Sequence, residues 1–405
     1  MKFDNNNNVL TLYLSGRIDA NNAAEIESEI SEIAAKNPGL VPTFDAGELE
    51  YISSAGLRVL LKFRKQFGKN LDVLNASNEV YDIFEVTGFT ELLNVKKKLR
   101  EISLENLELI GGGAFSKVYR LDPETIVKVF TSSIATLAGA EKDRMISREV
   151  FLHDIPTAIA YDVVKVGDKY GLVYEMIDAD TVAGTLAKHP ERLQELSIKM
   201  AHLMKKLHTT EFAPGTFPDA RDFLHRWAGL PFRKGLISAE DKALLDAFID
   251  RIPDRNTFVH MDYHPKNVML SNNELVLIDV GDSGLGHPIA DLLVTYAHLV
   301  FIGKVAAQHG KDDPAAGHHS QTLGLDRKML AAVWEAMMPV YFGTTDTETL
   351  KRYEEVLGGY AHLFMLYGVC ISPIPIPEEK LTMIVSMLME DLRKIIPTLK
   401  PIEGI

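Results

Sequence analysis

The residues with the clearest potential for chemistry lie in one segment near position 260, FVHMDYHPKNVMLSNNELVLIDVGDSG. It carries Asp262 and Asn267 ahead of a hairpin-like pair of apolar runs, and Asp279 after the second run. Carboxylate and amide oxygens are hard ligands that suit Mg²⁺. In phosphoryl transfer, one aspartate orients the acceptor hydroxyl while an asparagine and a second aspartate hold metal on the phosphates. The segment therefore predicts a phosphoryl-transfer site with Asp262 as the catalytic residue and Asn267 and Asp279 as metal ligands.

A second group of residues lies upstream, in LELIGGGAFSKVYRLDPETIVKVF (107–130). Gly111 and Gly113 stand between two strand-like runs, and glycine lets backbone approach phosphate oxygens that a side chain would block. Lys128 stands between two valines, so on a strand it points away from the core that its neighbours enter. A glycine turn beside a fixed cation could hold nucleotide phosphates, although glycine clusters on their own commonly serve only as turns.

Together these two groups resemble the protein-kinase-like fold, in its aminoglycoside/choline-type phosphotransferase branch. The resemblance rests on the glycine loop, Lys128 and the 260–279 segment in this order, and on IDVGDSGLGHPIADL (278–292). His264 and Pro265 follow Asp262 where protein kinases usually carry a lysine, which favours this branch. The resemblance implies transfer of the γ-phosphate of ATP (or GTP), with Mg²⁺, to a hydroxyl of a small-molecule acceptor.

The resemblance also assigns roles to single residues. Ser116 replaces the third glycine of the phosphate-covering loop, and Lys128 would hold the α- and β-phosphates. Glu149 would pair with Lys128, and Glu175 to Ile177 would supply the backbone hinge for adenine. Two further residues are expected to be structural: His260 as a hydrogen-bonding member of the catalytic loop, and Asp291 as its brace from the next helix.

The first hundred residues follow a different pattern, in which strands and helices alternate. VLTLYLSG (9–16) alternates apolar and polar positions as a half-buried strand does. LVPTFDA (40–46) predicts a short strand that ends at Asp45. Ser53 and Ser54 precede an amphipathic helix that Gly68 ends, and Ser53 is the expected N-cap. Such alternation predicts a small α/β domain.

This block resembles a STAS domain, the fold of bacterial anti-sigma-factor antagonists. GRIDA (16–20), YISSAGLRVLL (51–61) and EVTGFTELL (85–93) carry the resemblance. It implies a protein partner, and it implies phosphorylation of a serine or threonine at the start of the helix. The matching position is Ser54, which is the candidate phosphoacceptor.

The expected fold class is thus an α/β STAS domain with a mixed sheet and helices, followed by an α+β protein-kinase-like bilobal domain. The expected boundaries are residues 1–100 for the STAS domain, 101–106 for a linker, 107–178 for the N-lobe and 179–405 for a helical C-lobe.

Composition limits the other possibilities. A net charge of −13 argues against a general binder of nucleic acid or of membrane surfaces, because such proteins are normally basic. A single cysteine, Cys370, fits a reducing compartment, and the absence of a long apolar run favours a cytoplasmic protein. His208 is expected to pack or cap a helix end, and His318 and His319 are expected in a solvated loop.

Three hypotheses for function remain. The first is a small-molecule phosphotransferase with a regulatory STAS domain. The second makes the acceptor a protein serine, such as Ser54 of this or another chain. The third is an interaction module in which nucleotide biases partner binding without catalysis.

Overall fold

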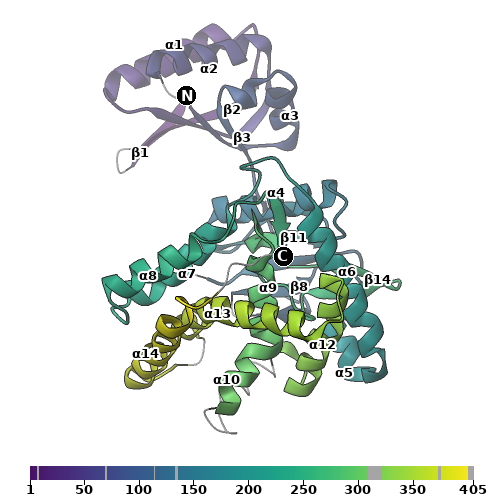
Figure 1. The fold of residues 1–405 in the computed structure, drawn as a ribbon. Coiled ribbons are helices and arrows are strands. Elements are labelled where there is room, and N and C mark those ends of the chain that lie inside the picture. Colours follow the sequence, from purple (N-terminus) through teal and green to yellow (C-terminus); the bar gives the residue numbers. More distant parts are fainter. Residues whose placement is uncertain are drawn as a thin grey trace. The chain divides into compact units, whose positions relative to one another are not determined.

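The computed structural model describes residues 1–6, 9–68, 71–113, 115–132, 136–308, 322–372 and 375–399. The chain forms two compact units, Met1–Ile102 and Ser103–Ile405 (Figure 1). The division falls within the stretch expected to be a linker. His318 and His319 lie outside the described residues.

The first unit contains a five-stranded mixed sheet in the order β1-β2-β3-β4-β5. β1 and β2 are antiparallel, and the other neighbours are parallel. Apolar side chains from the strands and helices form one core between sheet and helices. Its elements are β1 (Lys2–Asn6), β2 (Val9–Ile18), α1 (Ala23–Lys36), β3 (Pro42–Ile52), α2 (Ser54–Phe67), β4 (Asp72–Ala76), α3 (Asn78–Val86), η1 (Phe89–Glu91), β5 (Asn94–Lys97) and β6 (Arg100–Glu101).

Helix α2 has the ends that its sequence predicts. The Ser53 side chain accepts a hydrogen bond from the Ala55 N–H at 3.2 Å, and Gly68 ends the helix with φ 65°. The expected end of β3 at Asp45 was wrong, because the strand continues to Ile52. The extension is stabilised by parallel pairing with β2, whose Ile18 lies opposite Ile52.

The second unit begins with an antiparallel sheet. Its strands β7 (Leu109–Gly112), β8 (Ser116–Arg120), β9 (Thr125–Phe130), β10 (Ala160–Val166) and β11 (Lys169–Glu175) lie in the order β10-β11-β9-β8-β7. Helix α4 (Leu137–Leu152) lies between β9 and β10 in sequence and packs on β10 and β11. The glycine turn and Lys128 of β9 thus belong to one sheet, and α4 covers part of that sheet.

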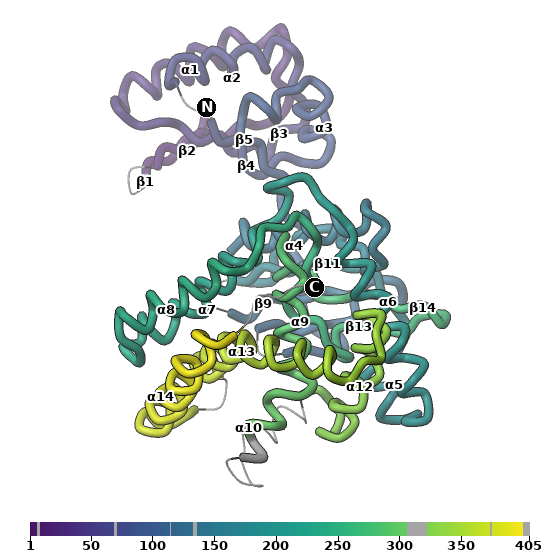
Figure 2. Tube along the Cα trace, viewed as in Figure 1, coloured from purple at the N-terminus to yellow at the C-terminus, as the bar shows by residue number. Residues whose placement is uncertain are grey.

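A larger helical region follows, with short strands that carry the loops of the site (Figure 2). Helix α13 packs against α7, α9 and α14, and α12 packs against α6. The elements are α5 (Val182–Lys188), η2 (Pro190–Arg192), α6 (Leu193–Thr209), α7 (Ala220–Arg233), α8 (Ala239–Ile249), β12 (Thr257–Val259), β13 (Val268–Ser271), β14 (Glu274–Leu277), η3 (Val280–Asp282), β15 (Gly284–Gly286), α9 (Ile289–Tyr296), the π-helical η4 (Ala297–Phe301), α10 (Ile302–Gln308), α12 (Arg327–Phe342), α13 (Thr347–Ile371) and α14 (Glu378–Ile395). Within the described ranges, no helix combines the length and apolar character needed to cross a bilayer.

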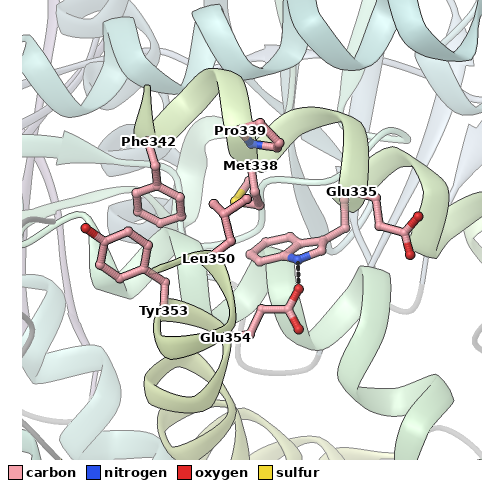
Figure 3. Close-up of a pocket in the computed structure, with 8 residues that line it drawn as sticks. Glu335, Met338, Pro339, Phe342, Leu350, Tyr353 and Glu354 are labelled. Carbon is pink, nitrogen blue, oxygen red and sulfur yellow. Dashed lines mark hydrogen bonds between the residues drawn. The ribbon is translucent and has the colours of Figure 1, made fainter. Parts of the chain in front are cut away.

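A small hollow of about 120 Å³ lies between α12 and α13 (Figure 3). Phe342 and Tyr353 stack at 4.3 Å on one side of it, and Trp334 donates a hydrogen bond to Glu354 at 2.9 Å on the other. Its lining includes none of the residues that the sequence assigns to phosphoryl transfer, so it is separate from the candidate site.

Candidate active site

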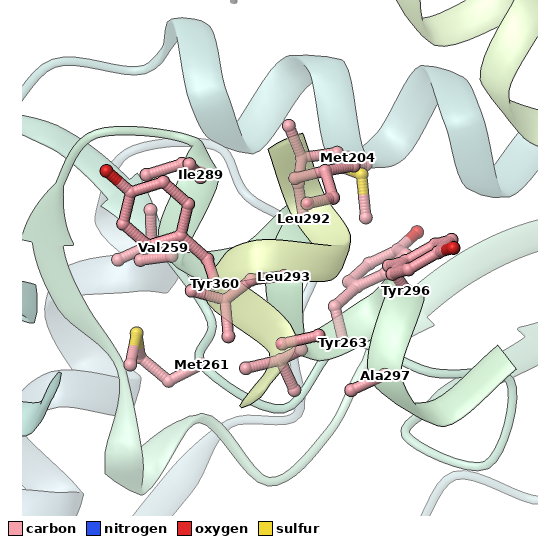
Figure 4. Packing of buried hydrophobic residues seen from close by; sticks show 14 of the residues in the cluster. Met204, Val259, Met261, Tyr263, Ile289, Leu292, Leu293, Tyr296, Ala297 and Tyr360 are labelled. Carbon is pink, nitrogen blue, oxygen red and sulfur yellow. The ribbon is translucent and has the colours of Figure 1, made fainter. Parts of the chain in front are cut away.

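The loop between β12 and β13 holds Asp262 between two buried neighbours. Met261 is 3% exposed and Tyr263 is fully buried, and both belong to the core around α9 (Figure 4). The Tyr263 hydroxyl donates to the Met200 carbonyl at 2.8 Å, and the Thr295 hydroxyl donates to the Tyr263 carbonyl at 2.9 Å. Apolar burial on both sides thus fixes the backbone of Asp262, while 44% of its side chain remains exposed.

Asp291 braces this loop from helix α9, as expected. Its fully buried carboxylate accepts hydrogen bonds from the His260 N–H at 2.8 Å and from the Met261 N–H at 2.5 Å. Met261 has a φ of 67°, a left-handed conformation that these bonds help to hold. His208 Nε2 lies 3.0 Å from the same carboxylate, and its Nδ1 lies 2.7 Å from the Tyr341 hydroxyl. His208 therefore supports the brace, which is more than the helix packing expected of it.

His260 is a structural member of the loop, again as expected. It is fully buried, its Nε2 lies 3.0 Å from the Ile278 carbonyl, and its Nδ1 accepts the Asp262 N–H at 3.2 Å. These bonds join the catalytic loop to the strand end that carries Asp279.

The carboxylate of Asp262 is surrounded by hydrogen-bond donors. Asn267 Nδ2 donates to Asp262 Oδ2 at 2.9 Å and to the Asp262 carbonyl at 3.0 Å. His264 Nε2 lies 3.5 Å from Oδ2, and His298 Nε2 lies 3.2 Å from Oδ1. Burial alone would raise the pKa of Asp262, but the two imidazoles outweigh it and hold the pKa well below its usual range. Asp262 is therefore ionised at neutral pH.

Lys128 and Asp279 meet although 151 residues separate them in sequence. Lys128 Nζ donates to Asp279 Oδ1 in an ion pair, with 15% of the lysine side chain exposed. Burial opposes the charged lysine, but Asp279 more than compensates, so the pKa of Lys128 is raised. The predicted phosphate-binding cation and the predicted metal ligand thus lie side by side.

Glu149 does not take the place expected of it. On helix α4 it lies on a different face from Ser147 and Val150, which are buried against the sheet. The acid of α4 that acts on Lys128 is Asp143, which shares the buried face. Among the ion pairs of the described residues, Lys128 has Asp279 as its partner. The expected pairing of Glu149 with Lys128 is not among the ion pairs of the described residues, and Asp143 is the acid of α4 whose charge acts on Lys128.

Asp143 approaches the Asp279 segment closely because residue 281 is glycine. A Cβ added to Gly281 would lie 2.4 Å from Asp143 Oδ2, so the Asp143 carboxylate would have to move to make room for a side chain. Burial, with smaller contributions from Asp282 and Asp279 and against the opposing charge of Lys128, raises the pKa of Asp143 to about 6. The carboxylates of Asp143, Asp279 and Asp282 interact here with Lys128 and Lys142, so acidic groups outnumber basic ones in this set and leave an excess of negative charge.

These residues fit a divalent cation. The Asn267 amide nitrogen is fixed by Asp262, which directs its Oδ1 away from that residue, and Asp279 retains Oδ2 beside the oxygen bound to Lys128. Two oxygen donors in a region of excess negative charge are the donor set that Mg²⁺ prefers. Asn267 and Asp279 are the residues that would hold it.

In the glycine turn, the residue under the strictest steric constraint is Gly112, which the sequence analysis did not single out. The Gly113 N–H donates to the Ser116 carbonyl at 2.9 Å, which closes the turn between β7 and β8. A Cβ on Gly112 would lie 2.9 Å from that carbonyl oxygen, whereas one on Gly113 would meet nothing within 4 Å. Gly111 lies opposite Val118 in the strand pair. Gly112 is therefore the position where a side chain is sterically excluded.

The expected hinge is firmly attached to its neighbours. The Glu175 carboxylate accepts the Ile159 N–H at 2.9 Å, and the Met176 N–H donates to the Glu124 carbonyl at 2.7 Å. The Ile177 carbonyl accepts the Ala179 N–H at 3.0 Å. The side chain of Glu175 thus has a structural contact, and only backbone of this segment remains for the adenine role that the sequence predicts.

Comparison with known families agrees with this geometry. The model of the phosphotransferase enzyme family matches residues 106–318, more than half of the chain, and the STAS domain model matches residues 1–102. The chain belongs to the phosphotransferase enzyme family and carries an N-terminal STAS domain. The expected fold class is confirmed, as is the expected class of enzyme, a phosphotransferase with an alcohol group as acceptor.

Individual relatives cover one unit or the other. A protein named anti-sigma factor antagonist BtrV, from Bordetella bronchiseptica, is 33% identical over 98 residues, 24% of this chain and 84% of that protein. The anti-sigma-B factor antagonist of Listeria monocytogenes is 27% identical over 100 residues, 24% of this chain and 87% of that protein. Among solved structures, ADP-bound aminoglycoside phosphotransferase APH(2'')-Ib is 16% identical with a TM-score of 0.46, covering 72% of this chain and 94% of its own. The structure of a choline/ethanolamine kinase family protein from Mesorhizobium loti is 14% identical with a TM-score of 0.44. The match covers 72% of this chain and 92% of that protein.

Proposed function

We propose that this protein is an ATP- or GTP-dependent, Mg²⁺-dependent phosphotransferase that phosphorylates a hydroxyl group of a small molecule, with the STAS domain as a regulatory unit. The observation that carries the proposal is the convergence of two distant segments, β9 and the 260–279 segment. Lys128 of β9 forms an ion pair with Asp279, and the Ile278 N–H next to Asp279 donates to the Asn267 carbonyl at 3.0 Å, which joins it to the Asp262–Asn267 loop. Membership of the phosphotransferase family supports the same reading.

The reaction follows from the contacts. Lys128 would bind the phosphates of the nucleotide, and Asn267 and Asp279 would hold a metal ion that neutralises phosphate charge. Asp262 accepts a hydrogen bond from the acceptor hydroxyl and directs its oxygen at the γ-phosphorus. The new oxygen–phosphorus bond forms as the bond to the β-phosphate oxygen breaks, and the hydroxyl proton passes through Asp262 to solvent. Because Asp262 is a weak base, its main contribution is orientation.

Binding of Mg-ATP provides the first test. Changing Lys128→Met removes a charge-assisted bond, so the Kd for Mg-ATP is expected to rise about 10- to 100-fold. Lys169→Met, at an exposed position of β11, is the matched control and is expected to leave the Kd unchanged. Isothermal titration calorimetry measures both. A wild-type protein that binds neither Mg-ATP nor Mg-GTP would contradict the proposal and favour the non-catalytic interaction module.

A second candidate function is phosphorylation of the protein itself at Ser54. The observation that favours it is that the two serines at the start of α2 differ in their surroundings. The Ser53 side chain caps the helix, whereas Ser54 is exposed in the first turn. A phosphate on Ser54 would lie near free backbone N–H groups and the positive end of the helix dipole.

Intact-protein mass spectrometry after incubation with Mg-ATP tests this candidate. Self-phosphorylation predicts a gain of about 80 Da that maps to Ser54. The gain must vanish in Ser54→Ala, which removes the acceptor, and in Asp262→Ala, which removes the residue that orients it. Ser53→Ala is the matched control, because it alters the cap and leaves Ser54 in place. No gain in mass, with Mg-ATP binding intact, would contradict the candidate and favour a separate small-molecule acceptor.

A further inference from the structure

Asp262 has one contact that neither its own loop nor the nucleotide-binding residues supply. His298 reaches it from η4, 36 residues further along the chain. Its Nε2 lies 3.2 Å from Asp262 Oδ1, whereas Asn267 and His264 both contact Oδ2. Of the residues that contact this carboxylate in the described structure, His298 is the one from outside the catalytic loop.

The backbone that carries His298 is unusual. Helix α9 continues into five residues of π-helix, Ala297–Phe301, before α-helix resumes in α10. A π-helical turn is rare, and such turns occur frequently at functional sites, where they change the direction in which a side chain points. His298 is the second residue of this turn, and its side chain is only 12% exposed.

Aromatic contacts with His264 and Phe364 hold the ring of His298. Its centroid lies 4.9 Å from that of His264 at an interplanar angle of 75°, and 4.8 Å from that of Phe364 at 65°. Edge-to-face packing on two partners restricts ring rotation. Burial lowers the pKa of His298 against the opposing hydrogen bond to Asp262, so the ring is neutral at pH 7.

The distances would also suit a metal ion, because Asp262, His264 and His298 have ligand atoms within 4.8 Å of one another. Nitrogen and oxygen ligands about 2.1 Å from a tetrahedral zinc ion lie roughly 3.4 Å apart. The position of the ring proton on His264 decides whether these three residues form a hydrogen-bonded cluster or a metal site. The Lys266 N–H donates to His264 Nδ1 at 3.2 Å, so Nδ1 is an acceptor and the ring proton lies on Nε2, the atom that faces Asp262. A protonated nitrogen donates a hydrogen bond and has no lone pair for a metal.

We propose that His298 is a positioning residue for phosphoryl transfer, which fixes Asp262 Oδ1 so that this oxygen is aimed at the acceptor hydroxyl. This inference rests on the function proposed above. Asn267 and His264 both hold Oδ2, so without His298 the carboxylate could rotate about its Cβ–Cγ bond. A small misplacement of the group that orients a reacting hydroxyl costs turnover far more than it costs nucleotide binding.

The experiment compares His298→Met, which fills the space without donating, with His298→Gln, whose amide restores an N–H donor near the position of Nε2. His202→Met, at an exposed position of α6, is the matched control. The acceptor is unidentified, so the probe is Mg-ATP hydrolysis with water as acceptor. His298→Met is expected to lower kcat about 10- to 100-fold with the Kd for Mg-ATP within about twofold. His298→Gln is expected to recover most of kcat, and the control to retain all of it.

Three outcomes would overturn the inference. One is His298→Met with unchanged kcat and intact Mg-ATP binding. Another is a fall in kcat and affinity together that glutamine does not rescue, which is the mark of a merely structural residue. The third is Zn²⁺ binding with one-to-one stoichiometry that His298→Met abolishes, because the cluster would then be a metal site. By contrast, absence of Mg-ATP binding to the wild-type protein would contradict the proposed function itself.

A direct measurement covers the case in which transfer to water is too slow to follow. In ¹⁵N spectra of the histidine-labelled full chain, His298 is expected to be neutral with its proton on Nε2. Asp262→Asn is expected to shift that resonance, and His202 is expected to stay in place. A His298 resonance that does not respond to Asp262→Asn would overturn the inference without any assay of activity.

Discussion

Replacing Asp262 by alanine is expected to lower the kcat of phosphoryl transfer about 10²- to 10⁴-fold, the range that positioned acid–base groups contribute. The Kd for Mg-ATP is expected to change by less than about threefold. The reason is that, in the part of the chain that the structure describes, Lys128 and Asp279 make no hydrogen bond to Asp262, and Asn267 keeps its bond to the Asp262 carbonyl at 3.0 Å. Nucleotide binding and turnover are thus predicted to separate in this one variant.

Hydrolysis of Mg-ATP and transfer to a panel of alcohols measure turnover, and calorimetry measures nucleotide affinity. Asp162→Ala, at an exposed position of β10, is the matched control for loss of one carboxylate. A variant that retains turnover within threefold of the wild-type protein would remove Asp262 from the reaction and leave orientation of the acceptor to other residues.

Asp291→Ala is expected to lower the free energy of unfolding of the second unit by about 3–5 kcal/mol, the usual cost of breaking a buried charged network by removal of one partner. The fully buried carboxylate satisfies two backbone N–H groups and lies against His208. Each buried donor left without a partner costs about 1–3 kcal/mol. The loss is therefore expected in stability and, through the catalytic loop, in activity.

Tryptophan fluorescence during urea unfolding measures this effect without interference from the STAS domain. Both tryptophans of the chain, Trp227 and Trp334, lie in the second unit. Asp291→Asn keeps the size and one acceptor oxygen, so an intermediate loss is expected, and Asp222→Ala on the exposed side of α7 is expected to change little. A loss below 1 kcal/mol in Asp291→Ala would mean that the loop does not depend on this brace.

Local patterns were sufficient for much of the fold. Helix α2 begins after Ser53 and ends at Gly68 because capping and a left-handed glycine are short-range effects. Strand β3 was predicted too short because its second half depends on long-range contacts. Its second half, after Asp45, contains Gly47 and acidic residues with poor strand propensity, and pairing with β2 keeps it extended. Pairing of this kind is determined by tertiary structure.

The candidate site shows the same contrast between what the local sequence predicts and what tertiary packing determines. Asp262, Asn267 and Asp279 belong to one short segment, so their types and order were enough to predict that they act together. Asp143 could not be told from Glu149, because both are acids on one helix and only the packing of α4 on the sheet selects the face. His298 gave no signal, since it lies in an apolar helix and reaches Asp262 through a π-helical turn that has no sequence signature of its own.

The brace at Asp291 also has a consequence for how the protein is made. Asp291 contacts His260, which lies 31 residues away in the sequence, and His208, which lies 83 residues away. His208 in turn contacts Tyr341, which lies 133 residues further along the chain. Contacts between such distant residues form late, because closing a long loop costs entropy before the contact offsets it. During synthesis, domains generally fold from the N-terminus onward. The STAS domain is complete after about a quarter of the chain, whereas the brace needs Tyr341. A ribosome-bound chain is thus expected to have a folded STAS domain well before it has a complete active site.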